Sequence, residues 1–546
     1  MFSSLTQKVM QRFRWIPYLI TLLRFRAHNR KVLGTGSKNG GGAPIMLMEL
    51  NAMHSAHIAY AYLADEMAKS RGAQIKAYAP RALKGIKQKL SFRLKALVGW
   101  AYFGSYKSFG ANEFLEIKLT DAQRERARAL YDQTLPRLKS TRDVEDMHIK
   151  GVWIGDLVYD TYMMATLKPT INLASEDFKQ FLLESLELYT FWDDYLTNHK
   201  VCGVNVSHCV YNLAIPLRLA VYRDILAFQA NVTHVYRLSR DNLFAYNDFF
   251  HFRERFAELP EEVREAGIAL AQHRIQRRFS GEVGVDMVYS TKSAYVAPKH
   301  SRLLRASDKK KILIATHCFF DSPHSYGKNT FPDFYEWMDF LGKMTECTDY
   351  DWYIKTHPDF LPGTKEIIDS FIARYPKFTL LPADASHHQI IAEGINLALT
   401  SYGTIAFEYA ALGIPVINAS MNNPHIAYDF NLHAPDPETY RRMLLDLDKL
   451  DFHIETRQIY EYYFMRHIYN TEDIFFENYE KSIEEIGGYN AQFTYLAYKK
   501  WLAVWTPSRH EKIVNALNAF VASGKFRMDY TFYGQEFSVA SLGDKQ

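Results

Sequence analysis

Residues 351–360 read DWYIKTHPDF, and residues 396–420 read NLALTSYGTIAFEYAALGIPVINAS. Two apolar runs in this stretch predict buried strands. The first ends at His357-Pro358 and the second at Ser401-Tyr402-Gly403-Thr404, where a helix is expected to begin. Open α/β sheets bind ligands at the carboxyl ends of their strands, and a helix start there favours an anion because its N–H groups are free. The stretch therefore indicates a site for a nucleotide or a phosphate group.

The same stretch belongs to a regular alternation of strands and helices. Strands are expected at 312–316, 352–356, 378–381, 396–400 and 415–418, with helices between them. An earlier alternation begins with the apolar run 44–50 and includes a strand at 152–155 and a basic helical insertion over 82–140. We predict an α/β fold of GT-B architecture, in which two Rossmann-like domains face a central cleft. Helical insertions and C-terminal helices complete it.

The chain has 546 residues, which is more than one hydrophobic core normally serves. We divide it into four parts by composition and periodicity. These are a basic amphipathic N-terminal segment (1–40), a Rossmann-like domain with a helical insertion and linker (41–300), a second Rossmann-like domain (301–480) and a C-terminal helical extension (481–546). The motifs described below lead us to expect that the first is the acceptor domain and the second the nucleotide-donor domain.

Charge and cysteine content limit the class of protein. The net charge of +4 is too small to indicate a nucleic-acid partner, and four cysteines in so long a chain favour a reducing cytoplasm over a disulfide framework. Residues 1–40 contain no acidic residue, and their apolar run 15–23 is too short to span a bilayer. This segment predicts peripheral contact with an anionic membrane surface; the alternative is a basic helix packed on the body of the protein.

The loop and helix start at 401–408 supply the main candidates for binding a donor nucleotide. Ser401, Thr404 and Glu408 share one helix face, and Gly403 allows a ligand to approach the backbone. A serine or threonine hydroxyl at this position can cap the helix and donate to a phosphate, and a carboxylate can accept from ribose hydroxyls. The alternative is plain helix capping with a solvated or salt-bridged glutamate.

Further candidates follow the other strands of the second domain. Pro358 fixes the chain just beyond a strand and directs His357 outward, where an imidazole can donate to a phosphate oxygen. His317, Asp321 and His324 lie in the loop after the strand at 312–316, where they could hold a phosphate or transfer a proton. The alternative is an ordinary polar loop.

The first domain supplies candidates for the acceptor side. His54, Asp156 and His208 follow predicted strands and, with Asp321, are candidate catalytic groups that could deprotonate an acceptor hydroxyl. Arg218 and Tyr211 are candidates for holding a charged acceptor. Spacing does not decide which group is the base, and Asp156 could instead cap a helix. The Asp446-Leu447-Asp448 sequence belongs to a polar amphipathic helix, so we predict neither a metal site nor a cofactor.

The segment KTHPD followed by LTSYGTIAFEYAALGIPVINAS resembles bacterial capsule and surface-polysaccharide glycosyltransferases of GT-B type, including Kdo transferases that use a CMP-activated sugar. The resemblance covers about 310–430 and is thinner over 150–220. It implies that the His-Pro motif and the serine- or threonine-containing helix start bind the donor's nucleotide phosphate, and that Glu408 meets the ribose. The Ser-Tyr-Gly-Thr centre differs from a plain Ser-Ser or Ser-Thr pair, which leaves the donor open.

Together these observations predict a glycosyltransferase of bacterial surface-polysaccharide synthesis. It would use a nucleotide-sugar donor, CMP-linked in the resemblance, and a glycan or lipid-linked acceptor. Two alternatives stay open. CDP-glycerol-type polyol-phosphate transferases share the fold and a similar His-Pro element, and a non-catalytic nucleotide-binding scaffold of envelope assembly would need only the donor half.

Overall fold

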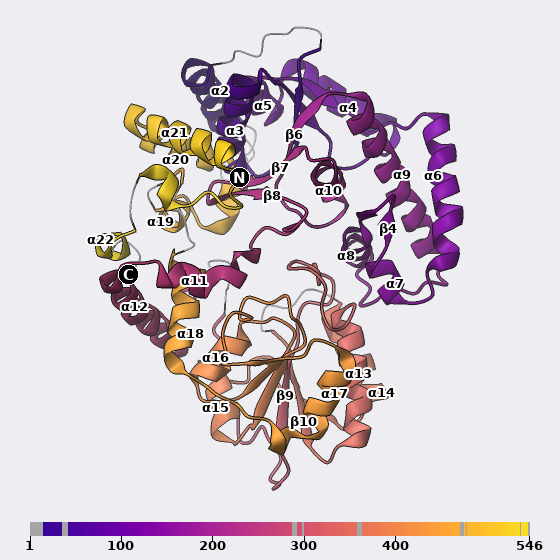
Figure 1. Ribbon diagram of the computed structural model, residues 1–546, viewed down its shortest axis with the longest axis vertical. Helices are drawn as coiled ribbons and strands as arrows, with labels where there is room; N and C mark the ends of the chain where they lie inside the picture. Colours follow the sequence, from indigo (N-terminus) through magenta and orange to yellow (C-terminus); the bar gives the residue numbers. More distant parts are fainter. Residues whose placement is uncertain are drawn as a thin grey trace, which may run out of the picture.

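The computed structural model has two lobes, each built on a six-stranded sheet (Figure 1). Hydrophobic clusters lie on both faces of each sheet, and a further cluster joins the helices beside the second lobe. The structure describes residues 15–34, 42–286, 292–296, 300–357, 363–469, 474–476, 478–534 and 537–543.

The first sheet has the strand order β3-β2-β1-β6-β7-β8. All neighbours are parallel except β7 and β8. Counted along the chain, the order is 3-2-1-4-5-6, which is the Rossmann order. Gly203 of β6 faces Met46 of β1, and a Cβ there would lie 2.6 Å from the methionine sulfur, so the close pairing requires glycine. The strands are β1 (Ile45–Glu49), β2 (Gln74–Tyr78), β3 (Ala111–Leu115), β6 (Val201–Val206), β7 (Leu226–Asn231) and β8 (His234–Leu238).

The second sheet repeats this order with every neighbouring pair parallel, as β11-β10-β9-β12-β13-β14. Each of the five strands predicted here is present, with ends within one residue of the prediction. The predicted α/β fold with two Rossmann-like domains is confirmed by these two strand orders. The strands are β9 (Lys311–Ala315), β10 (Asp351–Lys355), β11 (Phe378–Leu380), β12 (Leu397–Thr400), β13 (Val416–Asn418) and β14 (Leu432–His433).

Helices cover both sheets (Figure 1). Those of the first lobe are α3 (Ala56–Arg71), α4 (Gly85–Val98), α5 (Phe103–Ser108), α6 (Asp121–Thr134), α7 (Thr141–Glu145), α8 (Gly155–Thr166), α9 (Glu176–Asn198) and α10 (Ile215–Tyr222). Those of the second lobe are α13 (Phe334–Cys347), α14 (Thr364–Arg374), α15 (His387–Ala392), α16 (Ile405–Ala411), α17 (Pro437–Leu445) and α18 (Thr456–Tyr463).

Two predictions about the first lobe were wrong in detail. The insertion over 82–140 is not wholly helical, because it contains the edge strand β3. The strand predicted at 152–155 is β5 (Val152–Trp153), which pairs only with β4 (His148–Ile149) in a separate two-stranded ribbon. The antiparallel strand β8 and the short edge strand β14 were not predicted.

The helices near the lobe boundary do not follow simple sequence order. Helices α11 (Phe252–Ala257) and α12 (Glu261–Phe279) pack on α18, and the same apolar cluster includes α16. The chain then returns to the first lobe, on which α20 (Tyr495–Val504) and α21 (Pro507–Ser523) pack. Helix α19 (Tyr479–Glu485) precedes them in the sequence and follows the π-helical turn at 464–469. The last helix, α22 (Val539–Gly543), contacts α12.

The N-terminal helix α2 (Trp15–Val32) packs on the body of the first lobe. Leu22 and Phe25 are buried, and the Phe25 ring stacks on Tyr498 of α20 at a centroid distance of 4.1 Å. Residues 1–14 and 35–41 lie outside the described part of the chain. Of the segment 1–40, which was predicted to contact a membrane, the structure therefore describes only residues 15–34. Nowhere in the described residues is there a helix with the length and apolarity needed to cross a bilayer.

Candidate functional site

The candidate site is a cavity at the carboxyl edge of the second sheet, at the switch point between β9 and β12. Its volume is about 370 Å³, within the usual range of about 300–1000 Å³ for small-ligand sites. The loops after β9, β10 and β12 line it together with α12 and the segment 292–295. Of the predicted residues, His317, His357, Gly403, Thr404 and Glu408 line this cavity; Arg278, Tyr295 and Lys355, which were not predicted, line it as well.

His317 follows β9, and its ring is held in one tautomer. The Ser401 N–H donates to its Nε2 over 3.2 Å, and Thr400 Oγ1 lies 3.0 Å from the same nitrogen. Burial, with a smaller contribution from His357, lowers the pKa of His317 to about 3, so the ring is neutral. Because Nε2 accepts, the proton lies on Nδ1. The ring stacks on Phe334 with centroids 4.4 Å apart, and this packing fixes the direction of the Nδ1–H donor.

The loop between β12 and α16 brings the backbone to the cavity. A Cβ at Gly403 would lie 2.8 Å from Thr400 Oγ1 and 3.3 Å from His317 Cε1, so only glycine fits this approach. Thr404 begins α16 but makes no side-chain cap bond. Its hydroxyl instead helps to lower the pKa of Glu408. Ser401 is buried with its hydroxyl 3.5 Å from the Ala419 carbonyl, and this predicted donor ligand does not line the cavity.

Glu408 is buried at the cavity wall between two partners. The Arg278 Nη2 group lies 2.6 Å from Oε1, and the Tyr295 hydroxyl donates to Oε2. Burial alone would raise the pKa of Glu408, but Arg278 and Tyr295 outweigh it and the net pKa is lowered. The carboxylate is therefore ionised and fixed in direction, and its remaining lone pairs can accept from a ligand.

Lys355, the last residue of β10, is a buried cation beside the cavity. Its ammonium donates to the Ala383 carbonyl over 3.0 Å. Burial lowers its pKa to about 8, against the opposing effects of Asp384 and Glu408. His357, two residues further on, is exposed and lines the cavity. Pro358 of the predicted His-Pro pair lies outside the described residues.

Two predicted residues meet across the cleft between the lobes, and a third, His208, lies near enough for the charge of one of them to affect its pKa. The Tyr211 hydroxyl, from the loop after β6, donates to Asp321 Oδ1 in the loop after β9 over 2.7 Å. Desolvation in the cleft lowers the pKa of His208, and the Asp321 carboxylate opposes this shift. Tyr211 has a φ of 62°, a region that costs a non-glycine residue energy and is frequent at functional sites. The cluster thus joins the carboxyl ends of β6 and β9.

Asp156 and Arg218, predicted for catalysis and acceptor binding, pair with each other instead. Both side chains are buried, and two hydrogen bonds of 2.7 and 3.1 Å join the guanidinium to the carboxylate. Arg218 also stacks over Trp153 at 5.0 Å. Neither residue lines a cavity described here. The geometry is that of a structural ion pair, which does not favour a catalytic role for Asp156 or an acceptor-binding role for Arg218.

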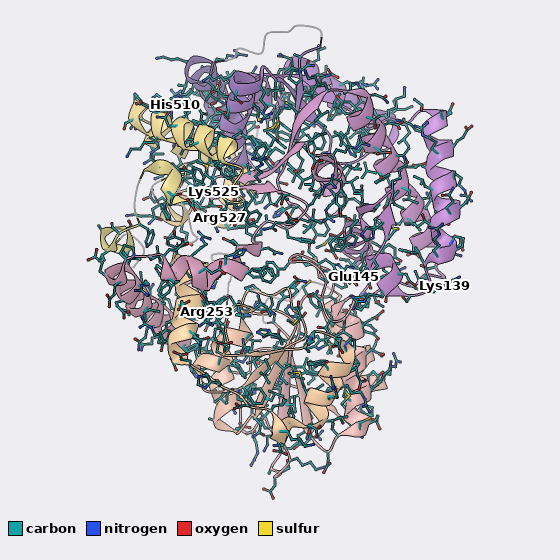
Figure 2. All side chains as sticks on the ribbon, viewed as in Figure 1. Lys139, Glu145, Arg253, His510, Lys525 and Arg527 are labelled. Atoms are coloured by element: carbon teal, nitrogen blue, oxygen red, sulfur yellow. The ribbon has the colours of Figure 1, made fainter. Side chains whose placement is uncertain are left out.

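His54 and His324 also lie away from the cavity. His54 Nδ1 is 2.9 Å from the Ala52 carbonyl, and its ring packs against Tyr498 beneath α2. His324 is fully buried between Asp160, whose Oδ1 lies 2.5 Å from Nδ1, and Glu145, whose Oε1 lies 3.2 Å from Nε2. Figure 2 shows Glu145 where the first lobe meets the second. His324 therefore ties the lobes together, and a role in donor binding is not what its position favours.

No group of three or more His, Cys, Asp or Glu side chains within the described residues has the arrangement needed to hold a metal ion. Asp446 and Asp448 form ion pairs with different lysines: Asp446 with Lys449 at 2.8 Å and Asp448 with Lys310 at 2.5 Å. The two aspartates do not form a joint site.

No protein-family model matches the chain, and no curated protein sequence matches it. Among solved structures, the chain is similar to a UDP-GlcNAc 2-epimerase from Neisseria meningitidis bound to UDP-GlcNAc, with 11% identity, 78% of this chain and 93% of that chain covered, and a TM-score of 0.23. A UDP-GlcNAc 2-epimerase from Methanocaldococcus jannaschii in complex with UDP-GlcNAc and UDP has 9% identity, coverage of 76% and 96%, and a TM-score of 0.22.

The glycotransferase of kitacinnamycin is a third similar structure, with 10% identity, 80% of this chain and 97% of that chain covered, and a TM-score of 0.19. TM-scores of this size carry no argument.

Proposed function

We propose that the chain is a glycosyltransferase that moves a sugar from a nucleotide-activated donor to a hydroxyl group of a glycan or lipid-linked acceptor. One observation carries the proposal. A cavity at the switch point of the second sheet is lined by charged and histidine side chains, and the loop after β9, which lines it through His317 and Cys318, is hydrogen-bonded through Asp321 to Tyr211 of the first lobe. A module that only binds a nucleotide needs the cavity but not the facing residues.

In this proposal the second lobe holds the donor. The Nδ1–H of His317 and the ammonium of Lys355 donate to the nucleotide phosphate, and His357 adds a further donor at the mouth of the cavity. Glu408 accepts from the ribose hydroxyls, with Arg278 holding the carboxylate in place. Gly403 lets the phosphate approach the backbone.

The first lobe supplies the base. His208 takes the proton of the acceptor hydroxyl, and the acceptor oxygen forms a bond to the anomeric carbon. The bond from that carbon to the nucleotide phosphate breaks at the same time, and the departing phosphate keeps the electron pair. Lys355 and the His317 N–H meet the charge that develops on it. Asp321 and Tyr211 hold the two loops in register.

The resemblance of KTHPD and the SYGT segment supports a finer assignment. We propose a CMP-linked, Kdo-like donor and a role in bacterial surface-polysaccharide synthesis at the inner face of the cytoplasmic membrane. The nucleotide sugar is a substrate in this proposal, and no cofactor is required.

Calorimetric titration of the full chain with CMP, CDP, UDP and GDP tests the donor half. We expect one nucleotide to bind, and His357→Ala to weaken it by about tenfold, which corresponds to the loss of one charge-assisted hydrogen bond. His148→Ala is the matched control, because this histidine is exposed and outside the cavity. Absence of binding to all four nucleotides, or equal affinity in His357→Ala, would refute the proposal. A product that gains phosphate would indicate polyol-phosphate transfer instead.

A further inference from the structure

A second cavity adjoins the candidate donor cavity at Thr404, which lines both. Its volume is about 330 Å³, and residues from both lobes form its walls. Two arginines and three histidines lie among its lining residues: Arg466, Arg527, His234, His425 and His467. The function proposed above does not use any of them.

The two arginines lie in different segments, one in a π-helical turn and the other in a segment that pairs with an edge strand. Arg466 and His467 lie in a π-helical turn, Phe464–Tyr469, that continues α18; such turns are rare and are frequent at functional sites. Arg527 lies in a segment that pairs with the edge strand β8, since the Met528 N–H donates to the Val235 carbonyl over 3.0 Å. Figure 2 shows Arg527 on the first lobe near the boundary with the second.

The charges around this cavity leave one guanidinium without a carboxylate. Asp248 pairs with Arg527 at 2.6 Å and with Arg255 at 3.1 Å. Asp286, which also lines the cavity, pairs with Arg278. Arg466 donates to the Tyr326 hydroxyl over 3.0 Å, and within the described residues it has no ion-pair partner. Within the described residues this half-buried cation pairs with no carboxylate, which favours an anion beside it.

His425 points to the same need. Its side chain is 1% exposed, it lines the cavity, and neither ring nitrogen has a hydrogen-bond partner within the described residues. Burial holds its pKa well below the usual range, so the ring is neutral and keeps one N–H donor. His467 Nε2 is likewise buried without a partner. An unsatisfied buried donor lowers the stability of the fold, and a ligand that accepts from it would offset that cost.

We propose that this second cavity binds an oxyanion, a carboxylate or a phosphate, carried by the glycosyl residue of the donor or by the acceptor. Arg466 presents a planar fork that matches either group, and His425 adds an N–H donor. Thr404 is shared by the two cavities, so a donor whose nucleotide fills the first directs its sugar to the second. Only this last placement rests on the proposed function.

Binding of simple oxyanions tests the assignment without any nucleotide. The probes are inorganic phosphate and N-acetylneuraminate, with N-acetylglucosamine as the neutral control, titrated calorimetrically into the full chain. We expect at least one oxyanion to bind more tightly than the neutral sugar, and Arg466→Leu to weaken it by about tenfold or more. Arg253→Leu is the control, because that arginine is exposed and paired with Asp429.

Equal oxyanion affinity in Arg466→Leu and wild type, or equal affinity for the neutral sugar, overturns the proposal. His425→Phe provides a second variant that fills the space, and it should weaken the same probe. Preference for N-acetylneuraminate indicates a sugar acid, and preference for phosphate indicates a phosphorylated substrate. If CMP, CDP, UDP and GDP all fail to bind while the oxyanion effect persists, the proposed function fails and this site stands.

An independent observation concerns α4, whose apolar face has no partner among the residues that the structure describes. Ile86, Leu90, Leu94 and Leu97 are 84%, 66%, 58% and 75% exposed. Their spacing of three or four residues places them on one side of the helix. Only Phe92 of this helix is buried. Single exposed leucines are ordinary, but a continuous row on one helix marks an interaction surface.

The charges of α4 indicate what the row contacts. The helix carries Lys87, Lys89, Arg93 and Lys95 and no acidic residue. Its other side lines a groove of about 1380 Å³ that extends to Asn51 and Tyr211 at the cleft. Figure 1 shows α4, α5 and α2 together at the end of the first lobe that is remote from the second.

We infer that α4 docks on an anionic bilayer, with its leucines in the acyl boundary and its lysines at the lipid headgroups. The groove beneath it then gives a lipid-linked acceptor a path from the bilayer to the cleft. This path rests on the proposed function, whereas the docking does not.

Vesicle sedimentation of the full chain tests the docking, with phosphatidylcholine vesicles that contain or lack phosphatidylglycerol. We expect binding to the anionic vesicles, and Leu90→Ser combined with Leu97→Ser to reduce the partition coefficient by about tenfold or more. Met421→Ser, an exposed methionine of the second lobe, is the control. Unchanged partition of the double variant overturns the inference. The inference is also overturned if the double variant abolishes a dimer of the protein but leaves vesicle binding unchanged, because the helix face would then contact a second copy of the chain.

Discussion

Replacing His324 by glutamine is expected to lower the free energy of unfolding by about 3–5 kcal/mol, the usual cost of removing one partner of a buried ion pair. His324 is fully buried between Asp160 of the first lobe, at 2.5 Å, and Glu145, at 3.2 Å. Glu145 keeps a second partner in Arg142. Asp160 has no other cation within ion-pair distance in the described part of the chain, so its uncompensated charge accounts for most of the loss.

Urea unfolding followed by tryptophan fluorescence gives the measurement, with midpoint and slope compared between variants. His251→Gln is the control, because this histidine is exposed and its loss should change the unfolding free energy by no more than about 0.5 kcal/mol. Asp160→Asn added to His324→Gln should recover part of the loss, since both charges are then absent. A His324→Gln unfolding free energy within about 1 kcal/mol of wild type would contradict the reasoning.

The pH dependence supplies a second check. Burial lowers the pKa of His324, but Asp160 and Glu145 outweigh it and the net pKa is raised well above the usual range. A group whose pKa rises on folding stabilises the fold fully below its unfolded pKa, about 6.5 for histidine. That contribution is lost as the pH rises through the folded value. The difference between wild type and His324→Gln should therefore be largest below about pH 6.5, and a difference that grows with pH would refute the assignment.

Lys355→Met should weaken nucleotide binding by about tenfold or more, and wild-type affinity measured by calorimetry should fall as pH rises through about 8, where Lys355 loses its proton. The variant should show no such fall; a parallel decline would mean that another group titrates. His208→Asn should lower kcat by about 10²–10⁴-fold with the nucleotide Kd unchanged, as expected for a general base; an unchanged kcat excludes that role. Gly342→Ala should cost about 1–3 kcal/mol in urea unfolding, because its Cβ would lie 2.6 Å from the Tyr375 ring; an unchanged midpoint would show that the ring moves freely.

The second lobe was predictable because its strands are buried on both faces. Parallel strands covered by helices read as continuous apolar runs, as in Ile312, Leu313 and Ile314 of β9. The edge strand β3 gave no such signal, since its sequence ANEFL exposes Asn112 and Glu113. Edge strands carry polar residues that discourage pairing with other chains. Because of these residues, the sequence of β3 could not be distinguished from the helical insertion around it.

The residues of the cavity were predictable where local sequence places them, and not where a distant helix contributes them. His317, Gly403 and Thr404 follow strands directly, so local sequence predicted their place at the edge of the sheet. Arg278 reaches Glu408 from α12, 130 residues away in sequence, and no periodicity reports such a contact. Asp156 and Arg218 were predicted near a strand end, but their mutual pairing depends on how α8 meets α10 and is a tertiary event.

Helices α11, α12 and α18 share one apolar cluster beside the second lobe, whereas α20 and α21, which follow them in the sequence, pack on the first lobe. The polypeptide passes between the lobes after β8, again after the π-helical turn, and once more before α22. Neither lobe is a continuous segment of sequence, so truncation at one point cannot yield either of them both intact and free of segments that pack on the other. A protease that cuts one of these passages leaves two others, and the nicked protein should remain a single particle in native gel filtration.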